Sequence, residues 1–141
     1  KAGGTPQDYP FWLLTARSMQ YAWGANVGMQ LIKEVADNIK GHRGVIINTQ
    51  RALELGIGDG EPVEIATPRH RVRGRAVLRQ GIRPDTLLLL GQFDHWATPF
   101  TKDFGMPSMN SLTEMSMDLT DATGSSADVV RVRIMPVGHE P

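Results

Sequence analysis

The chain contains no cysteine among its 141 residues. Disulfide bonds, thiolate zinc sites and cysteine-ligated iron–sulfur clusters are therefore excluded within it. It also has no excess of either charge, because 15 Lys and Arg residues balance 15 Asp and Glu residues. Bulk electrostatic attraction to nucleic acid or to a membrane is thus absent. No apolar run approaches the roughly 18 residues of a membrane-spanning helix, so we expect no direct membrane insertion.

Sequence patterns of catalysis and metal binding are also missing. The chain has four widely separated histidines: His42, His70, His95 and His139. Their spacing lacks the short intervals typical of zinc ligands. No nucleophile-elbow pattern occurs, and the glycines of residues 56–60 lack the following Lys of a phosphate-binding loop. We expect no catalytic residue and no metal ligand here, which makes a self-sufficient barrel enzyme the least favoured interpretation.

Short apolar runs and strict alternation predict a mainly β protein with short helices, folded as a small closed barrel. The expected strands cover residues 11–14, 45–48, 63–65, 71–78, 86–90 and 129–136.

Two helices are expected between these strands. Apolar residues at helical spacing predict a helix over residues 26–39 with Asn26 as its N-cap. Thr49 is expected to cap a brief helix over residues 50–55. Residues 1–8, which hold two Gly and one Pro, are predicted to be a flexible lead-in or linker. Residues 9–141 are then one domain.

One predicted strand is strongly basic. Six of the 15 Lys and Arg residues lie between Arg69 and Arg83, and no acidic residue lies between Ala66 and Pro84. A stand-alone β-barrel module could use this Arg69–Arg83 face for nucleic acid or another polyanion. The neutral net charge and the distant aromatic residues favour instead a solvated face or a docking surface on the rest of a larger protein.

Polar and aromatic residues gather in the predicted connections. They are Thr15, Arg17, Tyr21, Trp23, Asn26, Gln92, His95, Trp96, Asn110, Thr113, Asp118, Asp121 and Asp128. Such groups suit a large ligand with a heteroaromatic body and an anionic linker, because Arg holds phosphates, Asn and Asp read base edges, and Trp or Tyr stacks. An irregular loop with Arg17 in solvent and Trp23 in the core fits the first of these connections equally well.

A series of motifs resembles the C-terminal cofactor-binding domain of the molybdopterin-dinucleotide oxidoreductases, the dimethyl-sulfoxide-reductase superfamily. In order they are TAR at 15–17, VIINTQRALELGIGDGEPVEI at 45–65, the basic strand, GIRPDTLLLLGQFDHW at 81–96, PSMNSLT at 107–113 and DLTDATGSSADVVRV at 118–132. The long tail from GQFDHWATPF at 91–100 to DLTDATGSSAD at 118–128 is most like the branch that contains phenylacetyl-CoA:acceptor oxidoreductases, near the arsenate and polysulfide/thiosulfate reductases.

The resemblance implies a double-psi β-barrel that caps the bis(molybdopterin guanine dinucleotide) cofactor of a molybdenum or tungsten oxidoreductase. The implied cofactor-binding residues are Thr15, Ala16, Arg17, Tyr21, Trp23, Asn26, Gln92, His95, Asn110 and Asp128. Two positions depart from the family pattern. Ala16 stands where Gly is usual, and Asp128 follows Ala127 where many members carry a Lys.

The same resemblance implies the partners of the chain. They are the remaining domains of its own catalytic subunit, which hold the metal ligand, and an iron–sulfur electron-transfer subunit, with no nucleic acid. The sequence does not determine the compartment, which would be the cytoplasmic or the periplasmic face of a bacterial membrane complex for a soluble domain of this kind. A surface that docks on those domains should be exposed, including the methionines of the long connection: Met106, Met109, Met115 and Met117.

Overall fold

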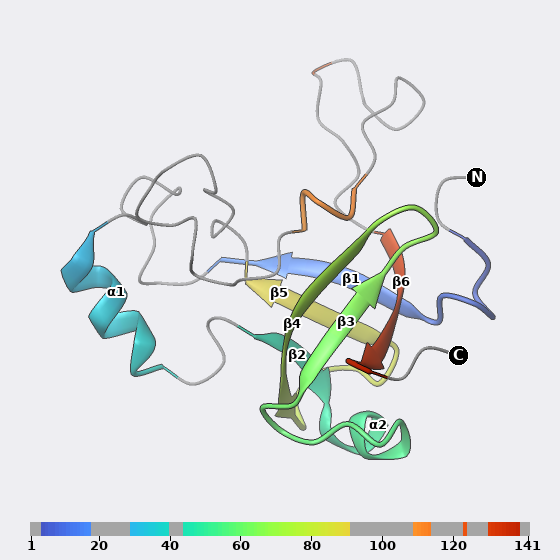
Figure 1. Ribbon diagram of the computed structural model, residues 1–141, viewed down its shortest axis with the longest axis horizontal. Helices are drawn as coiled ribbons and strands as arrows, with labels where there is room; N and C mark the ends of the chain where they lie inside the picture. Colours follow the sequence, from blue (N-terminus) through green and yellow to red (C-terminus); the bar gives the residue numbers. More distant parts are fainter. Residues whose placement is uncertain are drawn as a thin grey trace.

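The computed structural model describes residues 4–17, 29–39, 44–90, 109–113, 123 and 130–138. Each of the six predicted strands is present, and the two helices are short (Figure 1). The elements are β1 (Phe11–Ala16), α1 (Gln30–Asp37), β2 (Val45–Asn48), α2 (Thr49–Glu54), β3 (Pro62–Ala66), β4 (Arg71–Arg79), β5 (Thr86–Leu90) and β6 (Val130–Pro136).

The strands form a closed barrel in the order β1-β5-β2-β4-β3-β6, with β6 pairing back to β1. Two pairs are parallel, β1 with β5 and β2 with β4, and the remaining four pairs are antiparallel. Closure leaves no unpaired sheet edge, so every strand is hydrogen-bonded on both sides. The predicted mainly β fold with short helices, a double-psi β-barrel, is confirmed.

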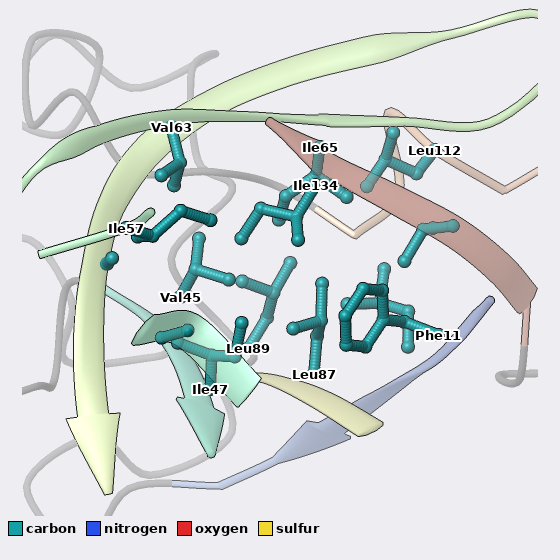
Figure 2. Packing of buried hydrophobic residues seen from close by; sticks show 14 of the residues in the cluster. Phe11, Val45, Ile47, Ile57, Val63, Ile65, Leu87, Leu89, Leu112 and Ile134 are labelled. Carbon is teal, nitrogen blue, oxygen red and sulfur yellow. The ribbon is translucent and has the colours of Figure 1, made fainter. Parts of the chain in front are cut away.

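Alternate residues of the strands fill the barrel interior (Figure 2). On β1, Phe11 and Leu13 are buried while Trp12 and Leu14, which follow them in turn, are exposed, which is the period of two of a strand with one face in the core. The other strands contribute Val45, Ile47, Val63, Ile65, Ala76, Leu87, Leu89, Val132 and Ile134. Apolar side chains from all six strands therefore meet in one core.

Helix α1 departs from the prediction in extent and in surroundings. It begins at Gln30, with Met29 in the N-cap position and no side-chain cap, so the prediction of Asn26 as its N-cap is wrong. Of the predicted apolar stripe, Leu31, Val35 and Ile39 are 68%, 51% and 41% exposed. Within the described residues, α1 contacts no other helix or strand (Figure 1). Its apolar face is therefore not part of the barrel core.

Helix α2 is capped one residue earlier than predicted. Asn48, not Thr49, holds the N-cap position, and its Oδ1 accepts a hydrogen bond of 3.1 Å from the backbone N–H of Arg51. Both residue types can cap a helix, but Asn48 has the extended backbone that a cap requires (φ −58°, ψ 131°). The helix ends before Gly56, whose φ of 71° favours glycine.

Candidate functional site at one end of the barrel

The strand directions bring several chain segments to one end of the barrel, which we call the rim. Parallel pairing aligns Ala16 at the end of β1 with Leu90 at the end of β5. Antiparallel pairing brings the start of β6 to β1, with Val130 opposite Leu13, and the start of β2 to β5, with Val45 opposite Leu89. The connections that leave β1 and β5 and those that enter β2 and β6 therefore all meet the barrel at the rim.

Thr15, Ala16 and Arg17 occupy the rim at the end of β1. Thr15 has the same alternation phase as the buried Phe11 and Leu13, yet it is exposed. Thr15 therefore adds an exposed hydroxyl-bearing residue to the rim. Ala16 is half-buried beside its β5 partner, and Arg17 is exposed. A hydroxyl and a guanidinium on a rigid strand end can both donate hydrogen bonds to an anionic ligand.

The turn over residues 109–113 presents Asn110 at the surface. Its neighbours Met109 and Leu112 are 8% and 1% exposed and belong to the core cluster, which also contains Ile65 and Ile134 (Figure 2). Backbone bonds from Leu112 and Thr113 to the carbonyl of Met109 close the turn. The expectation of an exposed Met109 is therefore wrong, since its side chain fixes the turn that exposes Asn110.

The remaining predicted cofactor residues lie outside the described residues. They are Tyr21, Trp23, Asn26, Gln92, His95 and Asp128. The chain leaves the described part after Arg17, at the end of β1, and after Leu90, at the end of β5, and it re-enters at Val130. Those three points are at or next to the rim.

Other chemistry is sparse in the part of the chain that the structure describes. That part contains no cluster of three or more His, Cys, Asp and Glu residues that could hold a metal ion. No helix in it has the length and apolar character needed to cross a membrane.

A cavity of about 340 Å³ lies at the opposite barrel end and is lined by Pro10, Phe11, Arg51, Glu54, Pro84 and Asp85. Its charged side chains are already in ion pairs, Arg51 with Glu54 and Asp85 with Arg83.

Comparison with known proteins identifies the class of this barrel. Residues 11–130 match the family model described as "Molydopterin dinucleotide binding domain". No curated protein sequence matches the chain. Among solved structures, the chain is similar to acetylene hydratase from Pelobacter acetylenicus, with a TM-score of 0.72 and 12% sequence identity. That match covers 93% of this chain and 19% of the acetylene hydratase chain.

The chain belongs to the molybdopterin dinucleotide binding domain family of the molybdopterin oxidoreductase superfamily, because the family model covers most of its length. The cofactor of such a domain is molybdopterin guanine dinucleotide, which carries molybdenum or tungsten. The chain spans about a fifth of the length of the solved structure that it matches. At 12% identity the structural likeness establishes the fold alone.

Proposed function

We propose that this domain caps a bis(molybdopterin guanine dinucleotide) cofactor within the catalytic subunit of a molybdenum or tungsten oxidoreductase, and that the cofactor binds at the rim. The observation that carries the proposal is the topology. All ten predicted cofactor residues belong to the rim itself, to the connections that begin or end there, or to the 109–113 turn within one of those connections. These residues come from five stretches of sequence, 15–17, 21–26, 92–95, 110 and 128, and the proposal places their side chains at one end of the barrel.

The described donors, at the rim and on the 109–113 turn, fit the chemistry of this cofactor. Arg17 can pair with a phosphate through its planar guanidinium, and the Thr15 hydroxyl can donate to a phosphate or pterin oxygen. The Asn110 amide can both donate to and accept from a pterin edge. Ala16 replaces the usual Gly and is half-buried, so its methyl group limits how closely a ligand approaches the backbone there. The cofactor supplies the metal and the redox chemistry. This chain supplies binding and orientation.

The apolar face of α1 supports the part of the proposal that places this domain within a larger catalytic subunit, on which it would dock. Leu31, Val35 and Ile39 follow one another at intervals of four residues, so they share one side of the helix. An apolar stripe of this kind is typical of a covered surface. The acetylene hydratase chain is about five times longer than the part matched here, which is consistent with further domains beside the barrel.

For the parent enzyme, the motif resemblance favours the phenylacetyl-CoA:acceptor oxidoreductase branch, with an iron–sulfur protein as electron-transfer partner. This finer assignment depends on the GQFDHWATPF and DLTDATGSSAD stretches, which lie almost entirely outside the described residues. The alternative function, nucleic-acid binding through the Arg69–Arg83 face, has no observation in its favour, since the net charge is zero.

A titration with GDP, which stands in for the dinucleotide tail of the cofactor, tests the rim. Backbone amide shifts are followed by NMR in the wild-type chain, in Arg17→Gln and in the matched control Arg83→Gln. Arg83 is an exposed arginine on the β4–β5 turn at the opposite barrel end. We expect shifts at residues 15–17 and at Asn110, and an affinity about tenfold lower in Arg17→Gln, the loss expected for one charged hydrogen bond. The control should bind like wild type.

Two outcomes would contradict the assignment of the cofactor to the rim. One is a set of shifts confined to residues 69–83 and reproduced equally by inorganic polyphosphate. The other is equal loss of affinity in the two variants, because that result would report a general charge effect and not a site.

A further inference from the structure

Barrel closure brings two distant basic segments together on one outer surface. Strand β3 lies between β4 and β6, and these three strands carry six arginines and a single carboxylate, Glu64. Pairing aligns Arg71 of β4 and Arg133 of β6 on either side of Ala66. The outward-facing set, which we call the arginine wall, consists of Arg71, Arg73, Arg75, Arg131 and Arg133 around Glu64. Arg131 and Arg133 lie about 60 positions beyond the basic strand in sequence.

The wall already binds one carboxylate. Nη1 of Arg71 donates to Oε1 of Glu64 at 3.2 Å, and Nε of Arg73 donates to Oε2 of the same side chain at 3.3 Å. The Glu64 side chain is only 14% exposed, whereas the side chains of Arg71 and Arg73 remain 54% and 73% exposed. Both arginines therefore keep donors directed to solvent after they have satisfied Glu64, since each guanidinium has five N–H groups.

Aromatic rings hold the β6 arginines in place. The guanidinium of Arg131 lies 3.8 Å from the centroid of the Trp12 ring, and that of Arg133 lies 5.9 Å from the Tyr9 ring. Stacking of this kind restricts the rotamers of an arginine before a partner binds. Less side-chain entropy is then lost on binding. The Nε of Arg133 is buried and has no hydrogen-bond acceptor among the described residues. The ring contacts therefore position the two β6 arginines beside Arg71 and Arg73.

We propose that the arginine wall docks a protein surface that presents carboxylates, at a place separate from the rim. The preformed Glu64 clamp is the chemical model for this contact, because it shows that the wall holds a carboxylate between two arginines. Arg71, Arg73 and Arg75 alternate along β4, so their Cα atoms recur about every 6.6 Å, the spacing of alternate side chains on an extended acidic segment. The planar guanidinium is also the donor best matched to a carboxylate.

Three features favour a protein partner over nucleic acid. The net charge of the chain is zero, so a polyanion gains no long-range attraction. Glu64 lies within the wall and would repel a continuous phosphate backbone, whereas a protein surface of mixed charge accommodates it. Trp12 and Tyr9 are already stacked on arginines, which leaves them less available for bases.

Fluorescence anisotropy with a labelled peptide of about ten glutamates, at about 50 mM salt where charge pairs are weakly screened, tests this proposal. The variants are Arg73→Gln and Arg131→Gln, with Arg83→Gln as a control that removes the same charge from an exposed arginine outside the wall. A further variant, Arg73→Lys, keeps the charge and removes the planar fork. A single-stranded oligonucleotide of equal charge serves as the competing polyanion.

We expect each wall variant to weaken peptide binding at least about fivefold, with Arg73→Lys intermediate and the control within about twofold of wild type. Absence of peptide binding to the wild-type chain would overturn the proposal and leave the wall as a solvated face. Equal loss in Arg83→Gln would also overturn it. Tighter binding of the oligonucleotide than of the peptide, lost in the wall variants, would assign the surface to nucleic acid instead.

Discussion

Replacing Asn48 by alanine removes only a few atoms but should lower the free energy of unfolding strongly, because this side chain makes two hydrogen bonds to different elements. Its Oδ1 caps α2 by accepting from the N–H of Arg51 at 3.1 Å, and its Nδ2 donates to the carbonyl of Ile82 at 2.8 Å. One side chain thus joins the end of β2, the first turn of α2 and the turn between β4 and β5. The side chain is half-buried, so water replaces these bonds only in part.

For Asn48→Ala, loss of the cap costs about 1 kcal/mol and the unsatisfied Ile82 carbonyl costs about another 1 kcal/mol. The free energy of unfolding should therefore fall by about 2 kcal/mol, which lowers Tm by roughly 6–8 °C for a chain of this size. Asn48→Asp keeps the capping oxygen and loses only the donor, so it should lose about half as much. Urea titration followed by circular dichroism measures both values.

Gln50→Ala is the matched control, because Gln50 is exposed on the same helix and its amide makes only a 3.4 Å contact with Glu54. It should change the free energy of unfolding by less than about 0.5 kcal/mol. The reasoning is refuted if Asn48→Ala is no less stable than this control. If Asn48→Asp is as unstable as Asn48→Ala, the bond to Ile82 stabilises the fold more than the cap does. The equal division of the roughly 2 kcal/mol between these two bonds is then wrong.

Two further substitutions test packing and electrostatics. Gly44→Ala should lower the free energy of unfolding by about 2 kcal/mol, since an added Cβ would overlap Val77 Cγ2 and approach the Arg75 carbonyl to 2.9 Å. Urea titration measures this loss. A double variant with Val77→Ala should recover part of it, because the second substitution relieves only the contact with Val77. Hydrogen bonding from Arg83 holds the pKa of the Asp85 carboxyl below its ordinary value of 3.8. This pair therefore contributes stability that is present above pH 3.8 and lost as the pH falls through the lower folded-state pKa. Arg83→Gln should raise the pKa of Asp85 in an NMR titration, and an unchanged pKa would contradict the hydrogen-bond assignment.

The strands could be predicted because each carries its own local signal. Burial of one face of a strand produces alternation, as in Arg71–Ala76, and burial of both faces produces an apolar run, as in β2 and β5. Either pattern can be recognised from adjacent residues alone. The cap of α2 was missed by one residue because Asn48 and Thr49 have similar capping ability. Backbone conformation, which no single residue type determines, decided between them.

Properties that depend on pairing between distant segments could not be predicted in the same way. Periodicity predicts that Leu31 and Val35 share one side of α1, but it does not determine what that side contacts. Likewise, the sequence shows a basic strand at 71–79 but not that Arg131 and Arg133 join it, since this follows from the pairing of β6 with β3. The buried Met109 is a third example, because an apolar residue in an irregular segment has no period that would orient it.

The most recognisable stretch of the chain, residues 45–65, determines the fold and lies mostly away from the rim. Besides the two bonds of Asn48, the Asp59 carboxylate accepts from the N–H of Leu78 at 3.0 Å, and the Glu61 carboxylate accepts from the N–H of Gly58 at 2.7 Å. These bonds close the barrel end opposite the rim with short, well-satisfied turns. Since that end and the common core hold the strands in register, the connections at the rim are free to differ between relatives without loss of the barrel. Family membership is therefore most evident in residues that do not contact the cofactor in our proposal, and the proposed contacts fall where local patterning is weakest.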